Sequence, residues 1–322
     1  MSTNTQKIPV GVSQCLLGEQ VRYDGGHKRS RYVTDQLNQY FEFHPMCPEV
    51  GIGLGIPRKP IRIVNVDGDS RVQQNDDPSV DVTDRLVDYA QQTIPEFKSL
   101  CGYIFMQNSP SCGVFDLKRY GENGYPLDKK GRGIYAREVI EAYPLLPVEE
   151  AGRLNDAGLR ENFITRVFAY HDWRTQVEPE PTAQKLINFY SRYKYQVMAH
   201  HVASYKAIGR LLADLKSRPI EELCDEFIVQ FMAALSHKAT RKGNTNAMMH
   251  LRGYLKNQLD AEEKAELGDL IENYRTGFVP LVVPMTLLKH HLLKVDDVYL
   301  QKQTFWSPHP EKLGLRNVQQ SS

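Results

Sequence analysis

The sequence has no long apolar run, little net charge and no paired cysteines. No hydrophobic stretch approaches the ~20 residues that a helix needs to cross a bilayer, and the start, MSTNTQKIPV, lacks the charged and then apolar plan of a signal peptide. The formal net charge is +1, and the 41% hydrophobic and 25% charged residues exclude a disordered or fibrous chain. We therefore expect a cytoplasmic protein that does not bind membranes.

The five cysteines are an odd number, spread over 322 residues without a C-x-x-C pair. This pattern excludes the disulfide framework of a small secreted domain. In a reducing compartment, cysteines that serve a purpose are more often metal ligands or catalytic groups than structural cross-links. The cysteines are therefore the first place to look for chemistry.

The length favours two domains, and the two halves differ in pattern. Residues 1–150 alternate apolar runs typical of strands, at 8–14, 61–66 and 102–107, with helical periodicity such as that from Asp81 to Pro95. This alternation predicts a Rossmann-like α/β domain with a mostly parallel sheet. The turn-rich segment 119–133 reads as a surface loop.

Residues 151–322 show helical periodicity almost throughout, including a long pattern that begins at Pro181. Gly277 ends one of these segments in the manner of a helix C-cap. The second half is therefore expected to be an all-α domain. The first half is net acidic and the second net basic.

Three cysteines, Cys15, Cys47 and Cys112, each follow an apolar stretch and lie among Gly, Pro and Ser. The loops at the carboxyl ends of parallel strands converge on one crevice. Three thiolates there are able to share an iron–sulfur cluster or a zinc ion, or they are three unrelated thiols; their spacing matches neither zinc ribbons nor ferredoxin runs. Cys101 and Cys224 are expected to be small buried hydrophobic residues.

The same three loops resemble a known family. VSQCLLGEQVRYDGGHK, HPMCPEVGIGLGIPR and NSPSCG are similar, in order and in cysteine position, to the three signature segments of the thiouracil desulfidase family. Downstream, FITRVFAY, YKAIGRLLA, ATRKGNTNAMMHLRGYLK and SPHP resemble the YbgA-like helical domain that is fused to many such desulfidases. Fusions of this kind look like bacterial tRNA 4-thiouridine desulfidases.

The resemblance implies that Cys15, Cys47 and Cys112 hold a 4Fe–4S cluster in which one iron has no protein ligand. An open coordination position characterises catalytic metal sites, and such an iron acts as a Lewis acid toward a thiocarbonyl sulfur. Water then attacks the carbon, and sulfur leaves as hydrosulfide without net electron transfer. The resemblance thus implies a desulfidase that acts on thiolated pyrimidine, most plainly 4-thiouridine in tRNA.

A water nucleophile needs a base, and Glu49 lies two residues after Cys47. The alternative for Glu49 is a loop carboxylate that caps backbone N–H groups. Ser109 and Ser111 precede Cys112 and are expected to orient the water or the pyrimidine, or else to shape the turn. Ser13, beside Cys15, is a weaker candidate for contact with the substrate.

Other residues of the signature segments are candidates for contact with a base or a phosphate: Tyr23, Asp24, Lys28 and Arg58. A turn built on Asp24-Gly25-Gly26 explains the aspartate equally well. The glycines of GIGLG lack the G-x-G-x-x-G spacing and precede prolines instead of a helix, which argues against a dinucleotide-binding fold.

The helical domain has two acid-free basic stretches, 182–213 and 236–256, which suit a tRNA partner. In the first, Tyr190, Tyr193, Tyr195 and Tyr205 interleave with basic residues, as in surfaces that stack RNA bases. The alternatives are tyrosines of the core and solvated helix faces. The predicted tRNA contacts of the second stretch are Arg241, Lys242, Asn244, Asn246, His250, Arg252 and Lys256.

Two further functions stay open from the sequence. The substrate is either tRNA or a small thiolated pyrimidine such as free thiouracil. Alternatively, the three cysteines bind a metal only for structure or redox sensing. No obligate protein partner is inferred.

Overall fold

The computed structural model describes residues 7–215, 217–292, 295 and 297–317, and these form two compact units, Met1–Asn155 and Asp156–Ser322. The sequence placed the domain boundary five residues earlier, at 150. Each unit is described by itself below. No helix in the described ranges is both long enough and apolar enough to cross a membrane.

The first unit is built around a parallel four-stranded sheet in the order β2-β1-β5-β8. Its strands are β1 (Ile8–Ser13), β2 (Phe41–Met46), β5 (Tyr103–Phe105) and β8 (Val148–Glu150). β1 lies at the centre and is buried because its side chains are apolar on both faces, as is usual for a parallel strand. The predicted α/β class is confirmed.

A second four-stranded sheet has the order β4-β3-β6-β7, with antiparallel pairs at its two edges. Its strands are β3 (Ile61–Val66), β4 (Asp69–Gln74), β6 (Leu117–Gly121) and β7 (Pro126–Gly131). The prediction of a loop over 119–133 is therefore wrong, because this segment makes a β-hairpin. Its strands are mostly polar; β7 is an edge strand, and most residues of both strands are exposed or half-buried.

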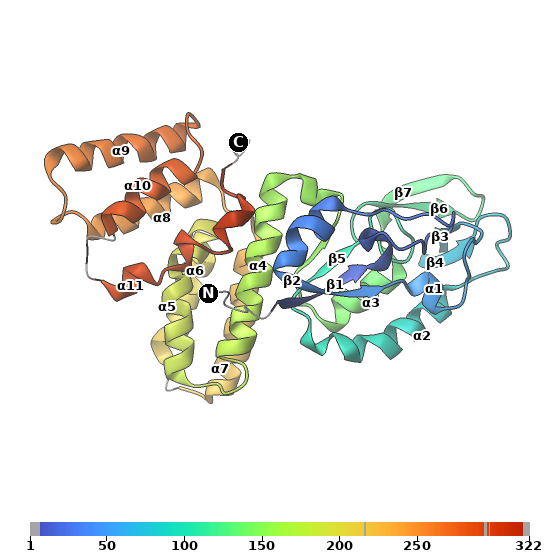
Figure 1. The fold of residues 1–322 in the computed structure, drawn as a ribbon. Helices are drawn as coiled ribbons and strands as arrows, with labels where there is room; N and C mark the ends of the chain where they lie inside the picture. Colours follow the sequence, from blue (N-terminus) through green and yellow to red (C-terminus); the bar gives the residue numbers. More distant parts are fainter. Residues whose placement is uncertain (1–6, 216, 293–294, 296, 318–322) are drawn as a thin grey trace. The chain divides into compact units, whose positions relative to one another are not determined.

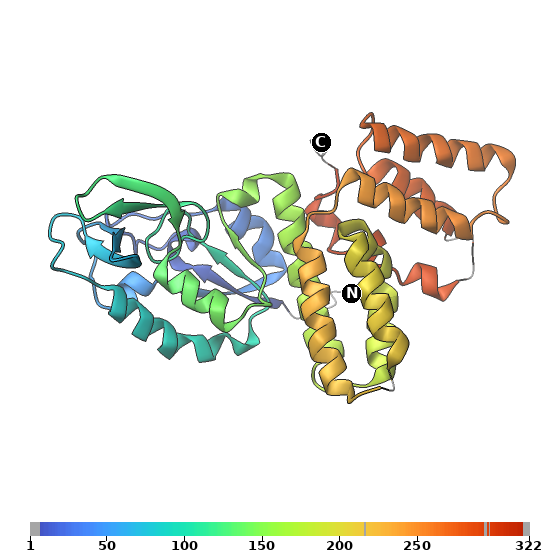
Figure 2. The same cartoon turned by 180° about the vertical axis from the view of Figure 1, so that it is seen from behind.

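Among the described residues, the first unit also has three α-helices, and two of these cover the sheets (Figures 1 and 2). They are α1 (Pro48–Gly51), α2 (Thr83–Thr93) and α3 (Ile134–Ala142). α2 and α3 lie side by side, and their aromatic rings reach the parallel sheet through Phe97, whose ring centroid is 5.7 Å from that of Tyr103. The helix expected after Asp81 is thus confirmed as α2.

The second unit is helical in its described residues, as predicted. Its helices are α4 (Ala157–Gln176), α5 (Ala183–His200), α6 (Val202–Leu211), α7 (Ile220–Ser236), α8 (Arg241–Tyr254), α9 (Ala261–Thr276), α10 (Val282–Leu292) and α11 (Val298–Gln301). The long pattern that begins at Pro181 is two helices, because His201 is extended and its side chain caps α6 by accepting from the Ser204 N–H. Gly277 ends α9 in the left-handed conformation, as expected.

Candidate active site

Three cysteines meet in one cavity at the carboxyl edge of the parallel sheet. Cys47 directly follows β2, Cys15 lies two residues beyond β1, and Cys112 follows β5 after a short loop. Because these strands are parallel neighbours, their carboxyl ends share one edge, and all three cysteines line the same cavity of about 270 Å³. Cys101 and Cys224 are buried elsewhere and do not line it.

The three thiols lie close enough to influence one another. Burial, reinforced by the charge of Cys47, raises the pKa of the Cys15 thiol to about 11. Burial also raises the pKa of Cys47 and, with the charges of Cys47 and Glu49, that of Cys112. Thiols of this kind keep their protons at neutral pH unless a positive centre replaces them, which is what metal binding does.

This donor set fits a cluster better than a single ion. Among the described residues, no three His, Cys, Asp or Glu side chains are arranged as ligands of one metal ion. Thiolates that bind different irons of one cluster stand farther apart than the ligands of a single ion. Three thiols on the wall of one cavity are donors of the kind that hold an iron–sulfur cluster.

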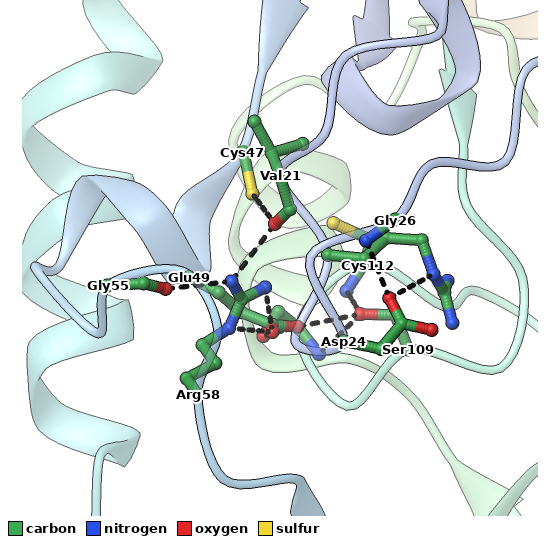
Figure 3. A network of polar contacts seen from close by, with 11 residues as sticks. Val21, Asp24, Gly26, Cys47, Glu49, Gly55, Arg58, Ser109 and Cys112 are labelled. Atoms are coloured by element: carbon green, nitrogen blue, oxygen red, sulfur yellow. Dashed lines mark hydrogen bonds and ion pairs between the residues drawn. The ribbon is translucent and has the colours of Figure 1, made fainter.

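Glu49 is fixed by four hydrogen bonds on the wall of the same cavity (Figure 3). It comes from the first turn of α1, and its side chain is 13% exposed. Its Oε1 accepts from the hydroxyls of Ser109 at 3.2 Å and Ser111 at 3.0 Å. Its Oε2 accepts from Arg58 Nε at 3.0 Å and Nη2 at 2.7 Å. The three residues predicted to be catalytic thus form one network.

Arg58 differs from the loop cation that the sequence suggested. Its side chain is only 5% exposed, and its Nη1 donates to the carbonyl oxygens of Val21 at 3.0 Å and Gly55 at 3.1 Å, as Figure 3 shows. Because all three guanidinium nitrogens are bonded to protein, Arg58 supports Glu49 instead of presenting a free cation to a phosphate. Sequence reasoning missed this pair, which no spacing rule encodes.

Two serines shape the loops around the thiols. The Ser109 hydroxyl accepts from the backbone N–H groups of Ser111 at 3.2 Å and Cys112 at 3.1 Å, so it forms the turn as well as reaching Glu49. The Ser13 hydroxyl is buried, accepts from the Met106 N–H at 2.9 Å and offsets part of the pKa rise of Cys112. Ser13 therefore joins β1 to the segment after β5, although it also lines the cavity.

Of the predicted residues Tyr23, Asp24 and Lys28, only Tyr23 lines the cavity. Tyr23 lines the cavity and is 42% exposed, next to Arg22, a lining residue that the sequence analysis did not select. Asp24 and Lys28 are exposed and lie outside the lining. Asp24 accepts from the Gly26 N–H at 3.0 Å, which is the turn that the sequence offered as its alternative role.

The predicted tRNA residues in the second unit do not share one surface. Asn244 is 1% exposed and donates to the Tyr274 hydroxyl at 3.1 Å, so its assignment to a tRNA contact is corrected to the helical core. Arg252 is half-buried and donates to the Lys264 carbonyl at 2.9 Å. Lys242, His250 and Lys256 are exposed, while Arg241 and Asn246 are half-buried.

The tyrosines of the first basic stretch are mostly core residues. Tyr190, Tyr193 and Tyr195 are 8%, 5% and 2% exposed, and only Tyr205 is half-buried. They pack against aromatic residues of neighbouring elements, for example Tyr193 against Phe231 of α7. The expectation that this whole set stacks RNA bases is therefore wrong.

Comparisons with known proteins divide the chain in a similar way. Residues 10–151 match the family model described as 2-thiouracil desulfurase, and residues 194–310 match DUF1722, a family of unknown function. The uncharacterized protein YbgA of Escherichia coli (strain K12) is 29% identical over 158 residues, which are 49% of this chain and 94% of YbgA. YbbK, an uncharacterized protein of Bacillus subtilis (strain 168), is 30% identical over 108 residues, which are 32% of this chain and 71% of YbbK.

Among solved structures, a [4Fe–4S]-dependent thiouracil desulfidase named TudS is similar to this chain. The match has 27% sequence identity and a TM-score of 0.37, and it covers 46% of this chain and 94% of TudS.

Proposed function

Since this chain belongs to the 2-thiouracil desulfurase family through residues 10–151, we propose that it is an iron–sulfur desulfidase that replaces the sulfur of a thiolated pyrimidine with oxygen. The observation that carries the proposal is the meeting of three cysteines, two of them buried and Cys47 half-buried, and an anchored carboxylate in one cavity. The net reaction joins a thiocarbonyl compound with water and yields the carbonyl compound and hydrogen sulfide, so no oxidant or reductant is needed.

Cys15, Cys47 and Cys112 would hold the cluster. When bound, a 4Fe–4S cluster with an open iron supplies a thiophilic Lewis acid that withdraws electrons from the C=S carbon. The walls of the cavity include Tyr23, Ile61 and other apolar surface against which a flat pyrimidine ring can pack.

Glu49 is the group that moves the proton. Its carboxylate accepts a proton from water as the oxygen attacks the thiocarbonyl carbon, and it returns the proton when the sulfur leaves. Arg58 and the two serines hold both carboxylate oxygens, so the carboxylate does not have to be oriented during the reaction. Positioning of this kind is why we assign Arg58 to the active site as a positioning residue.

For the substrate we propose 4-thiouridine in tRNA. The DUF1722 match in the second unit, the resemblance of its segments to fused tRNA desulfidases, and the exposed Lys242 and Lys256 in an acid-free stretch support this choice. Basic side chains without acidic neighbours are suited to RNA phosphates.

The test compares two substrates on one preparation. Anaerobically reconstituted full-length protein is incubated with tRNA that contains 4-thiouridine and, separately, with free 4-thiouracil, and sulfide and plain pyrimidine are quantified. We expect turnover of the tRNA at lower substrate concentration than of the free base. Turnover of the free base alone would assign the enzyme to small thiopyrimidines, and absence of sulfide from both would leave a metal-binding or redox-sensing module.

The ligand assignment has its own prediction. Cys15→Ala, Cys47→Ala and Cys112→Ala should each lose bound iron and turnover, because each thiol lines the cavity. Cys101→Ala and Cys224→Ala are controls, since both cysteines are buried but lie outside the cavity. Iron content and absorption near 400 nm, measured anaerobically, report the result; full iron in any of the first three variants contradicts the assignment.

A further inference from the structure

The helical unit has a groove that the desulfidase proposal does not use. It measures about 610 Å³ and lies among α5, α6, the end of α8 and α11. Tyrosines from all four helices line it: Tyr190 from α5, Tyr205 from α6, Tyr254 from α8 and Tyr299 from α11. It shares no residue with the cysteine cavity.

The tyrosine rings are held in place through their hydroxyls. The Tyr190 hydroxyl donates to the Tyr205 carbonyl at 3.2 Å, and the hydroxyls of Tyr195 and Tyr254 lie 3.1 Å apart. Tyr254 also contacts Tyr299, with ring centroids 6.3 Å apart. Tyr254 nevertheless stays 44% exposed, so part of an anchored aromatic ring is open to the groove. An exposed ring fixed at its far end is a platform for a flat partner.

The charges of the groove have one sign. Lys194 and Lys206 are the charged residues in its lining, and no carboxylate lines it. The Lys194 Nζ lies 6.0 Å from the ring centroids of both Tyr195 and Tyr205. Within the part of the chain that the structure describes, neither lysine has an ion-pair partner. The groove therefore offers two uncompensated cations beside aromatic surface.

We propose that this groove binds a nucleotide of single-stranded RNA, with the base stacked on Tyr254 and a phosphate at Lys194 and Lys206. Aromatic platforms beside lysines are the arrangement by which proteins hold unpaired nucleotides. An apolar helix would leave both ammonium groups without a partner, whereas a nucleotide satisfies the ring and the charges together.

Continuity favours RNA over a free mononucleotide as the occupant. Two exposed basic residues lie close in sequence to lining residues: Arg210 is one helical turn after Lys206, and Lys256 is two residues after Tyr254. A chain of phosphates can follow these cations, while a single nucleotide cannot. The inference rests on the proposed RNA substrate for the identity of the polymer, and it names where an unpaired segment of that RNA is held.

Binding is tested on the full-length protein with a fluorescently labelled single-stranded hexaribonucleotide, by fluorescence anisotropy across a salt series. Tyr254→Ala should weaken binding roughly 10–100-fold, because base stacking on one aromatic ring is lost. Tyr254→Phe keeps the ring and should stay within about threefold of the parent chain. Tyr125→Ala is the matched control, since Tyr125 is 74% exposed in the first unit and should leave binding unchanged.

The lysines give an independent readout. Lys194→Ala with Lys206→Ala should lower the dependence of log Kd on log salt by roughly 0.7 for each phosphate released. Thermal melting of each variant checks that the helical unit is folded. Equal affinities for Tyr254→Ala and Tyr125→Ala, or an unchanged salt slope, would overturn the proposal. Uridine monophosphate that binds as tightly as the hexamer would overturn the RNA assignment in favour of a free nucleotide.

The assay separates this inference from the proposed function because it needs neither cluster nor thiolated substrate. Hexamer binding that depends on Tyr254 supports the groove even where tRNA is not desulfurised. If the protein desulfurises tRNA but Tyr254→Ala binds the hexamer as tightly as the parent chain, the proposed desulfidase function is supported and the proposed RNA-binding groove is contradicted.

Discussion

At the scale of single residues, the Glu49 carboxylate depends on partners from distant parts of the chain. Ser109 and Ser111 bind one oxygen and Arg58 the other. A carboxylate held on both sides, with the Arg58 guanidinium 2.7 Å from Oε2, keeps its orientation. Substitution of Glu49 itself therefore tests its role in proton transfer, and substitution of its partners tests how its position affects the reaction.

Glu49→Gln should reduce turnover by ~10²–10⁴-fold, because the amide preserves the size of the side chain but cannot accept the proton. Iron content should stay at the parent level, since Glu49 is not among the assigned ligands. Glu122→Gln, in the turn between β6 and β7, is a control for loss of one carboxylate. Single-turnover kinetics within a factor of a few of the parent chain would show that another group activates the water.

Arg58→Met should also lower turnover, because Glu49 then loses the two hydrogen bonds to its Oε2. If Arg58 acts only through Glu49, the double variant Arg58→Met with Glu49→Gln should be no slower than Glu49→Gln alone. The effects of substitutions within one hydrogen-bond network are not additive. The double-mutant cycle of kcat measures this. If the decrease in kcat of the double variant equals the product of the decreases in the two single variants, Arg58 acts on the substrate directly.

A buried histidine gives the helical unit a dependence on pH. Burial lowers the pKa of His200 to about 4, and its Nδ1–H donates to the His237 carbonyl at 2.6 Å. The unfolded chain takes up this proton at about pH 6.5 and the native chain only near 4. The contribution of neutral His200 to the free energy of unfolding is thus complete above pH 6.5. Between pH 6.5 and pH 4, this free energy falls by about 1.4 kcal/mol for each pH unit.

Both tryptophans, Trp173 and Trp306, lie in the helical unit, so denaturation followed by their fluorescence reports that unit. We expect the unfolding free energy to fall between pH 6.5 and 5, with a flatter profile for His200→Asn, because an amide is a hydrogen-bond donor that does not titrate. Parallel pH profiles for the two proteins would contradict the assignment to His200.

The residue scale also shows what the sequence could reveal of the site. The cysteines, Glu49 and the serines were predictable because they lie in three short segments with recognisable patterns. Arg58 was not predictable as the partner of Glu49, because a loop meets α1 only in the folded chain. Asn244 was misassigned although a signal existed: it shares helical spacing with the apolar, buried Ala247, Met248 and Leu251, which marks a core face.

At the scale of secondary structure, two glycines of α8 form a natural comparison. A Cβ on Gly243 would clash with the Ala199 carbonyl of α5, whereas a Cβ on Gly253 has no atom within 4 Å. Gly243→Ala should therefore destabilise the helical unit by about 1–3 kcal/mol through overpacking. Gly253→Ala should be neutral or stabilise it by up to about 1 kcal/mol. Tryptophan-detected denaturation distinguishes them, and equal stabilities would contradict the close α5–α8 contact.

The elements that the sequence predicted are those with strong apolar patterns. Ile8–Ser13, Ile61–Val66 and Tyr103–Phe105 are apolar runs, and α2 has a clear helical period. Several of the missed strands are polar, for example Pro126–Gly131, whose residues are mostly exposed. Such strands are stabilised by backbone pairing with neighbours, and the sequence of the strand itself does not record that pairing.

At the scale of the whole molecule, the proposal for tRNA predicts how charge affects binding. Lys242→Glu with Lys256→Glu should weaken tRNA binding by at least about tenfold at moderate salt and reduce its salt dependence, because both side chains are exposed in an acid-free stretch. Turnover of a free thiobase should not change, since its chemistry belongs to the first unit.

Lys302→Glu with Lys312→Glu is the control, because it makes the same change in charge at exposed lysines outside the acid-free stretch 236–256. Filter binding of tRNA across a salt series gives the comparison. Arg252 is left intact because it bonds to the Lys264 carbonyl and its reversal would disturb α9. If both double variants lose affinity equally, the effect is one of overall charge and the α8 surface is not the contact.

The chain passes from one compact unit into the next at Asn155–Asp156, with no intervening linker domain. For a ligand large enough to touch both units, engagement of the second unit is an intramolecular event governed by effective concentration. A small thiobase gains nothing from this, because it occupies one unit only. Preference for a polymer over its isolated base can therefore arise from avidity, with no difference in how the cysteine cavity holds the ring. Two individually weak sites on one chain are sufficient for such a preference.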